Sequence, residues 1–195
     1  MLQDVELTGS RVKLVPLDPT HIDGLFAAGQ DPQIWRYLPI QVAAKEDMVA
    51  LVLEALEEKS RGSQLPFTVF DLTNDRIVGS TRFLLINEPN KNLEIGWTWY
   101  SSDVWRTDVN SECKFLLLTY CFEVLGYVRV QLKTDVRNER SNQAIQRIGA
   151  KYEGTLRNDR ILPDGYIRNS NLYSIIDSEW ATVKHNFQSK LLRTN

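Results

Sequence analysis

The chain has 195 residues, 43% of them hydrophobic and 25% charged, with a formal net charge of −2. This length and composition are typical of a single globular domain, expected over residues 1–195, and the slightly acidic balance gives no support for nucleic-acid binding. Because no apolar run approaches the roughly 18 residues of a membrane span and the first residues lack a signal-peptide layout, we expect a cytoplasmic protein with no membrane partner.

The first hundred residues predict a strand, helices and then three more strands. Residues 11–16 are typical of a short strand. Helices are expected after Asp18-Pro19, which is a common helix start, and over residues 32–37 and 46–61. The short links between the next three predicted strands indicate an antiparallel meander, with strands at residues 67–72, 77–86 and 93–100.

The second half predicts a helix–strand–helix unit, a hairpin and a last helix. Apolar residues at helical spacing indicate a long, largely buried helix that starts at Asn110 or Ser111 and ends at Gly126. A shorter helix capped by Asn138 follows a strand. Two further strands surround a Pro163-Asp164-Gly165 turn before the C-terminal helix. This order predicts one mixed α/β (α+β) sheet with helices on both faces.

The two predicted helix starts at residues 105–111 and 135–141 are the candidate binding site. Basic residues lie close to both in the sequence. Helix N-termini present unpaired N–H groups and the positive end of a dipole, which suit phosphates and other anions. Two such starts around one strand would suit a long phosphorylated cofactor. The alternative is that both are ordinary capped connections.

The cysteines and histidines form no metal-binding or nucleophilic pattern. Cys113 and Cys121 lie eight residues apart on one predicted helix. At ~1.5 Å of rise per residue they are too far apart for a disulfide. His21 and His185 are isolated at opposite ends of the chain. We therefore expect no bound metal, and we interpret the cysteines as small buried residues in a reducing compartment.

Five segments, in their order along the chain, resemble the GNAT acetyltransferases (Gcn5-related N-acetyltransferases), and within them the RimJ/RimL-like branch. These segments are LTGSRVKLVPLDPTHIDGL, DRIVGSTRF, LEIGWTWYSSDVWRTDVNSEC, TDVRNERSNQAIQRIGAKYEGTLR and GYIRNSNLYSII. The resemblance covers nearly the whole chain. It implies a mostly antiparallel, twisted sheet that splays between the fourth and fifth predicted strands, residues 93–100 and 128–134.

The resemblance implies acetyl-CoA as a cosubstrate. The loop that opens the long helix would receive the pyrophosphate, and its residues are Arg106, Thr107, Asp108, Val109, Asn110 and Ser111. The pantetheine arm would pair along Thr98, Trp99 and Tyr100, while Asn138 and Ser141 match positions beside the arm and the thioester. The implied partners are acetyl-CoA and an amine, and the resemblance leaves a homodimer open.

Two positions depart from the family pattern. Asp108 stands where the loop usually has glycine, and Asn110 where it has alanine or glycine. Asp108 adds negative charge beside an anionic ligand, although Arg106 could offset it. Ile145 stands where many members carry a tyrosine that protonates the leaving thiolate. These departures favour, as an alternative, a regulatory module that binds CoA without catalysis.

Catalytic roles are assigned by the same resemblance and by strand alternation. Glu94 is the candidate general base, although it could equally be a solvated carboxylate at a strand end, and Ser141 is the candidate hydrogen-bond partner of the thiolate or simply a first-turn helix residue. Alternation puts Glu94, Gly96, Thr98 and Tyr100 on one face of their strand, and Ile95, Trp97 and Trp99 on the other. Weaker base candidates are Glu153 and Asp135. Arg82 either lines an acceptor groove or pairs with a carboxylate.

The expected function is therefore direct acetyl transfer from acetyl-CoA to a primary amine, either a protein N-terminus or a small amine. A backbone N–H near Thr98 or Trp99 would stabilise the oxyanion. A third interpretation sets the resemblance aside and describes a nucleotide- or sugar-phosphate-binding α/β protein.

Overall fold

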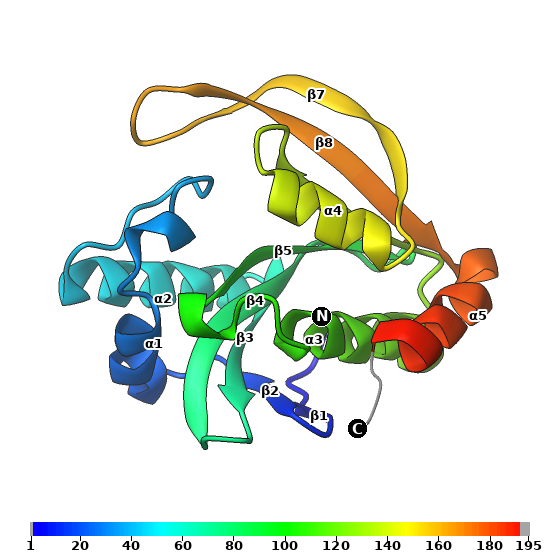
Figure 1. Ribbon diagram of the computed structural model, residues 1–195, viewed down its shortest axis with the longest axis horizontal. Helices are drawn as coiled ribbons and strands as arrows, with labels where there is room; N and C mark the ends of the chain where they lie inside the picture. Colours follow the sequence, from blue (N-terminus) through cyan, green and yellow to red (C-terminus); the bar gives the residue numbers. More distant parts are fainter. Residues whose placement is uncertain (1, 192–195) are drawn as a thin grey trace.

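The protein is built on one eight-stranded sheet, which the computed structural model describes for residues 2–191 (Figure 1). The strand order is β1-β2-β3-β4-β5-β6-β8-β7. Every neighbouring pair is antiparallel except β5 and β6, which are parallel. The predicted mixed, mostly antiparallel sheet with helices on both faces is confirmed.

The observed elements follow the predicted order closely. The strands are β1 (Leu7–Thr8), β2 (Val12–Pro16), β3 (Gln64–Asp71), β4 (Arg76–Asn87), β5 (Asn92–Tyr100), β6 (Arg129–Asp135), β7 (Lys151–Ile161) and β8 (Ile167–Ile176). The main helices are α1 (Ile22–Ala28), α2 (Lys45–Ser60), α3 (Val109–Thr119), α4 (Glu139–Arg147) and α5 (Asp177–Asn186). Strand β1 has only two residues, too few for a periodic pattern, so it was not predicted.

Short 3₁₀ and π turns replace parts of the predicted helices. Asp18 caps a 3₁₀ turn at Pro19–His21 before α1 begins. The helix predicted at residues 32–37 is only a 3₁₀ turn at Pro32–Ile34. The long helix ends in a π turn at Tyr120–Val124, followed by Gly126 with a φ of +62°. None of the helices formed by residues 2–191 is both long and apolar enough to cross a membrane.

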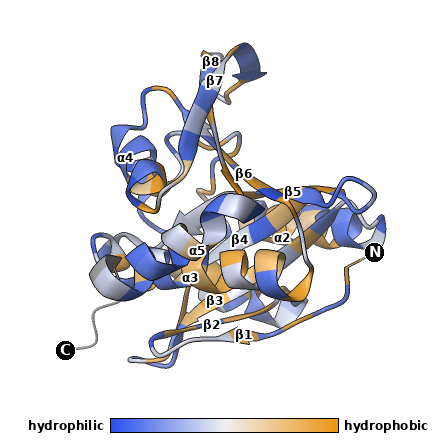
Figure 2. Ribbon diagram, turned by 90° about the vertical axis from the view of Figure 1, so that its right-hand side faces the viewer, coloured by the Kyte–Doolittle hydropathy of each residue, from blue (hydrophilic) through white to orange (hydrophobic). Residues whose placement is uncertain are grey.

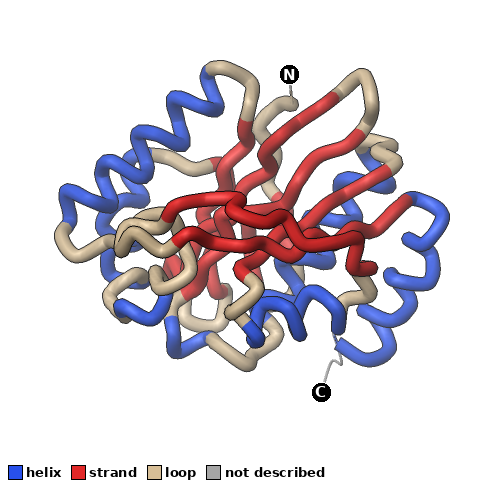
Figure 3. The backbone as a smooth tube through the Cα atoms, turned by 90° about the horizontal axis from the view of Figure 1, so that it is seen from above, coloured by secondary structure: helices blue, strands red, loops and turns tan. Residues whose placement is uncertain are grey.

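The two faces of the sheet carry separate hydrophobic clusters. On one face α1 and α2 cover a cluster that includes Met48 and Trp99. On the other face α3, α4 and α5 cover the larger cluster, which includes Cys113, Ile145 and Val183. Figure 3 shows the strands in the middle with helices along both sides. Figure 2 shows that the central strands carry much of the hydrophobic sequence, whereas the outer part of the β7–β8 hairpin is hydrophilic.

The sheet opens between β5 and β6. The two strands pair over three positions only, the last of which joins Glu94 to Gln131. Beyond Glu94, the side of β5 that faces β6 has no strand partner among the described residues. Parallel pairing therefore stops where β5 still has six residues to run, and the expected splay between these strands is present.

A β-bulge in β5 overturns the predicted alternation of its side chains. Arg82 pairs with Gly96 whereas Ser80 pairs with Trp99, so β5 has one more residue than β4 in this interval. Trp97 takes up the extra residue with a φ of +51°. After the bulge the faces exchange, and the prediction that Thr98 shares the face of Glu94 is wrong. The same exchange corrects Tyr100, which lies in the cluster under α3, and Trp97 and Trp99, which contact the cluster under α1 and α2. Ile95, which precedes the bulge, lies opposite Glu94 as predicted.

Candidate active site

The start of α3 differs in detail from its prediction. The N-cap is Asp108, not Asn110 or Ser111, and its side chain makes no capping hydrogen bond. The first helical hydrogen bond runs from the Glu112 nitrogen to the Asp108 oxygen, at 2.8 Å. The N–H groups of Asn110 and Ser111 come before it and are left outside the helical pairing. These are the donors that the first turn offers to an anion.

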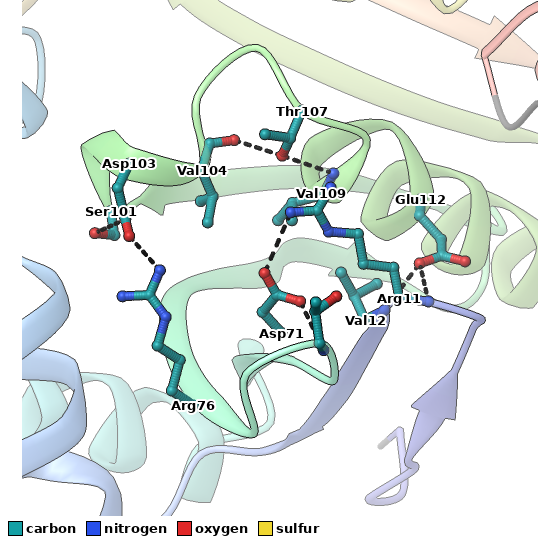
Figure 4. A network of polar contacts seen from close by, with 11 residues as sticks. Arg11, Val12, Asp71, Arg76, Ser101, Asp103, Val104, Thr107, Val109 and Glu112 are labelled. Carbon is teal, nitrogen blue, oxygen red and sulfur yellow. Dashed lines mark hydrogen bonds and ion pairs between the residues drawn. The ribbon is translucent and has the colours of Figure 1, made fainter. Parts of the chain in front are cut away.

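The loop before α3 obtains its shape without glycine. Arg106 adopts the left-handed region, with a φ of +64°, whereas Asp108 has a φ of −75°. The conformational freedom of glycine is therefore not needed at position 108. Thr107 braces the loop, since its Oγ1 donates to the Val104 oxygen at 2.7 Å and accepts from the Val109 nitrogen at 3.4 Å (Figure 4).

Glu112 fixes the first turn of α3 to the start of β2. Its buried carboxylate accepts hydrogen bonds from the Ser10 nitrogen and Oγ, both at 2.7 Å. It also accepts from the Arg11 nitrogen at 2.9 Å and from the Val12 nitrogen at 2.8 Å (Figure 4). A Cβ at Gly9 would lie 2.6 Å from the Glu112 Cδ, so the turn must pass close to the carboxylate. We did not predict this role, although a charged residue in an otherwise apolar helix was the available signal.

The start of α4 is capped as predicted by Asn138, whose side chain accepts a hydrogen bond from the Ser141 nitrogen at 3.1 Å. The helix is held to the sheet by Asn142, which was not predicted. Its Oδ1 accepts from the Tyr173 hydroxyl at 2.7 Å and from Asn171 at 2.9 Å. Because Asn142 takes the buried position, Ser141 stays half-buried at the side of the helix.

Basic residues bring the two helix starts together. The Arg140 guanidinium lies over the Trp105 ring, 3.6 Å from its centroid, and so joins α4 to the loop before α3. Partial burial and the neighbouring charge of Arg106 both lower the pKa of Arg140. Two guanidinium groups therefore lie near the helix starts, where Asp108 is exposed and the Asp31 carboxylate favours the charged form of Arg140. The positive charges of Arg106 and Arg140 suit an anionic ligand that binds between the two helix starts.

The three predicted positions on β5 contribute differently. The Thr98 hydroxyl contacts Thr81 Oγ1 at 2.7 Å and accepts a hydrogen bond from Lys114 Nζ at 2.9 Å. Trp99 is buried against Trp35, with ring centroids 5.0 Å apart, and Tyr100 lies in the core beneath α3. The side chains of Trp99 and Tyr100 are therefore core residues, and only their backbone could meet a ligand.

Glu94 is a buried carboxylate at the last paired position of β5. It is 4% exposed, and its Oε2 accepts a hydrogen bond from Gln131 Nε2 at 2.8 Å. Gly96 makes room for it, because a Cβ there would lie 3.0 Å from Glu94 Oε1. Glu94 shares its face with Arg82, which pairs with Glu54 of α2 at 2.7 Å. The carboxylate therefore faces the α1 and α2 side of the sheet.

The other site candidates are tied into the structure. Arg82 pairs with the Glu54 carboxylate, which is one of its two predicted roles. The hydrogen bond from Arg129 lowers the pKa of Glu153 to about 2. Burial opposes ionisation of Asp135, but hydrogen bonds from Arg137 lower its pKa overall. Ile145 is a core residue without any polar group. Residues 2–191 contain no cluster of three or more His, Cys, Asp or Glu side chains suited to a metal ion.

A mixed sheet that opens between two parallel strands, with a helix start on each side of the opening, is the architecture of acyl-CoA-dependent acyltransferases. The model of the acetyltransferase (GNAT) domain family matches residues 11–151, and the chain belongs to this family of acetyltransferases. A relative described as the uncharacterized N-acetyltransferase p20 of Bacillus licheniformis is 24% identical over 175 residues, covering 88% of this chain and 96% of the relative.

Solved structures support the same assignment. A GCN5-related N-acetyltransferase from Brucella melitensis superposes with a TM-score of 0.91 at 28% identity, covering 97% of this chain and 86% of that one. RimL, described as a ribosomal L7/L12 alpha-N-protein acetyltransferase, has the same fold, with a TM-score of 0.78 at 21% identity over 90% of this chain and 96% of its own. The RimJ/RimL-like resemblance is thus confirmed at the level of the family and its fold.

Proposed function

We propose that this acetyltransferase moves the acetyl group of acetyl-CoA to a primary amine by direct attack of the amine, and that Glu94 accepts the proton of that amine. The observation that carries the proposal is the position of Glu94. It is a buried carboxylate at the point where β5 leaves β6, on the face opposite α3. The CoA-binding helix starts lie on the other face, so the amine and the cosubstrate approach the opening from opposite sides.

The chain's own residues fit acetyl-CoA. Asn110 and Ser111 offer unpaired first-turn N–H groups to the pyrophosphate, and Arg106 and Arg140 supply positive charge. The amide nitrogen of Asn138 donates to no described residue, because the cap uses only its oxygen. When bound, acetyl-CoA supplies an acetyl group activated as a thioester. The free edge of β5 from Gly96 to Tyr100 is where the arm would pair.

Glu94 and Ser141 have different expected roles. A general base must reach the proton it removes, and a buried carboxylate with a single neutral partner, Gln131, is placed to do so directly or through one water. The Ser141 hydroxyl makes no hydrogen bond to a described residue, and it lies in the first turn of α4 beside the arm. It would hydrogen-bond the sulfur of the cosubstrate.

The acceptor side is bordered by the loop before α2 and by the β7–β8 hairpin. Arg168 of β8 donates to the Tyr37 oxygen at 3.0 Å. Arg137 lies over the Tyr166 ring, 3.4 Å from its centroid, at the foot of the β7–β8 turn. The first contact joins the loop before α2 to the hairpin, and the second joins the loop before α4 to it. RimL's described substrate is a protein N-terminus, which supports a protein N-terminus or a small amine as the acceptor class here.

The test is acetyl transfer to a panel of amines and short peptides by Glu94→Gln, with the exposed α2 residue changed in Glu46→Gln as the matched control. Loss of a general base typically lowers the rate by ~10²–10⁴-fold. We expect that loss in Glu94→Gln, together with a shifted ascending limb of the pH–rate profile and unchanged CoA affinity. Full turnover with an unaltered pH profile would refute the role of Glu94. Binding of acetyl-CoA by the wild-type protein without transfer to any acceptor would favour the non-catalytic module.

A further inference from the structure

Lys114 is a buried cation that the proposed function leaves without a role. It lies in the second turn of α3, three residues after Ser111, and is 6% exposed. Its ammonium donates one hydrogen bond, to Thr98 Oγ1 at 2.9 Å, and forms no ion pair with a carboxylate of the described residues. An ammonium has three N–H donors. At least one donor therefore has no protein acceptor, and burying such a group is costly unless something is gained from it.

The position of this ammonium is defined by the bulge in β5. Thr98 is the residue that directly follows the left-handed Trp97, beyond the last pairing of β5 with β6. The bulge turns Thr98 towards α3, whereas Glu94 faces α1 and α2. Glu94 and Lys114 therefore flank the open edge of β5 from opposite faces, one as a proton acceptor and the other as a proton donor.

The path of the cosubstrate leads to the same place. Its phosphates belong at the first turn of α3, and its arm would run along β5 from Tyr100 back towards Gly96. The reacting end then reaches the bulge. Lys114 contacts β5 there from the side of α3, whereas Arg82 lies on the opposite face over Trp97.

We propose that Lys114 donates its proton to the sulfur of CoA as the acetyl group leaves. This inference rests on the proposed function and adds the acid to its base. The amine nitrogen forms a bond to the acetyl carbon and loses a proton to Glu94. The carbon–sulfur bond breaks, its electron pair stays on sulfur, and the sulfur takes the proton of the Lys114 ammonium. Water then returns a proton to Lys114 and removes one from Glu94, so protons balance over the cycle.

The acid–base properties of the site suit this transfer. Burial lowers the pKa of Lys114 to about 8, while the Cys113 thiol on α3 and the Glu94 carboxylate on β5, the titratable groups that act on it, favour its charged form more weakly. Burial raises the pKa of Cys113 to about 12, so that thiol stays neutral near pH 7. An ordinary thiol has a pKa of about 8.5. Proton transfer from Lys114 to a thiolate is therefore close to balanced, which is the favourable case for acid catalysis.

The first test needs no acceptor amine. CoA bound to the protein is titrated with pH, its thiolate is followed by ultraviolet absorbance, and desulfo-CoA serves as the blank. An opposite charge close to an acid lowers its pKa by ~1–3 units. We expect the bound thiol to titrate at least ~1 unit lower in the wild type than in Lys114→Met. Lys184→Met, which removes a half-buried lysine of α5 that is paired with Glu123, is the charge-matched control and should titrate as the wild type.

Equal thiol pKa values in the wild type and Lys114→Met, with equal CoA affinity by calorimetry, would overturn the inference while leaving the proposed function standing. Failure of the wild type to bind CoA would instead refute the proposed function. Calorimetry also shows whether Lys114→Met has kept its fold.

The second test separates proton donation from simple electrostatics. In the wild type, kcat should fall as pH rises through about 8, because the acid must be protonated. Lys114→Arg keeps a positive charge but holds its proton far above this range. We expect it to lower kcat at least ~10²-fold with little change in CoA affinity, and to lose the descending limb. Wild-type kcat and an unchanged descending limb in Lys114→Arg would show that Lys114 is not the acid.

Discussion

Changing Glu112 to glutamine should destabilise the fold strongly, although the change replaces a single atom. The carboxylate has one oxygen that accepts from the nitrogen and hydroxyl of Ser10, and another that accepts from the nitrogens of Arg11 and Val12, all at 2.7–2.9 Å. Glutamine keeps one of the two acceptor oxygens. At the position of the second oxygen it places an NH₂ group, which is a donor and faces two other donors. Two hydrogen bonds to a charged group are lost, each worth ~1.5–3 kcal/mol.

The expected loss in the free energy of unfolding is roughly 3–5 kcal/mol, the scale observed when one partner of a buried charged network is removed. That is a large part of the ~5–15 kcal/mol that stabilises a typical domain. Urea unfolding followed by tryptophan fluorescence measures it. Glu6→Gln is the control, because Glu6 forms only an exposed ion pair with Lys13 in the same part of the chain, and its loss should cost at most ~1 kcal/mol. If Glu112→Gln costs no more than the control, Glu112 does not anchor α3 as the structure indicates.

Three further predictions concern the two helix starts and the buried lysine. Asp108→Gly and Asp108→Asn should both bind CoA more tightly by calorimetry, because each removes an exposed, unbonded negative charge. The two gains should be similar, since the negative φ of Asp108 gives glycine no conformational advantage. Weaker binding in both variants would show that the carboxylate shapes the loop. Asn138→Asp keeps the capping oxygen and loses the amide donors, so it should weaken CoA binding by ~1–2 kcal/mol without the loss of stability expected for Asn138→Ala; equal CoA affinity in Asn138→Asp and the wild type would place the arm elsewhere. Burial lowers the pKa of Lys114 from 10.5 to about 8, so the folded chain binds this proton more weakly than the unfolded chain. The resulting destabilisation is complete below pH 8 and disappears as pH rises towards 10.5. Lys114→Met should therefore raise the free energy of unfolding at pH 7, by up to ~3 kcal/mol at ~1.4 kcal/mol per pKa unit less the lost Thr98 hydrogen bond. This gain should shrink by pH 10, and a pH-independent gain would exclude the titration of Lys114 as its cause.

Much of the fold could be predicted because it depends on local sequence. Asp18 and Asn138 cap the turns that follow them, and Gly126 follows the long helix with a positive φ. Apolar spacing located every strand of five or more residues to within a few positions. The splay between β5 and β6 was expected from the resemblance rather than from spacing, and the pairing pattern confirms it.

Errors arose where a local rule was applied through a structural irregularity. Strict alternation along β5 placed Thr98 beside Glu94, but the bulge at Trp97 exchanges the faces. Gly96 is the one signal in the LEIGWTWY segment, because a glycine inside a strand often marks a bulge. It does not identify the extra residue, which depends on how the two strands match in length and twist. The cap of α3 was likewise placed inside the helix, since Asp108, Asn110 and Ser111 are all common capping residues and only the backbone distinguishes them.

The sequence by itself determined the order of elements, the two helix starts and the carboxylate on the strand that precedes the first of them, because capping, periodicity and alternation act between residues that are neighbours in the chain. Only the tertiary structure decided what those residues do. Glu112 meets β2 about a hundred positions away in sequence, and Lys114 meets Thr98 through the packing of a helix on a bulged strand. Their partners are fixed by long-range contacts. The sequence shows only that a charged residue interrupts the apolar pattern of the helix, and the fold is needed to identify what that residue binds.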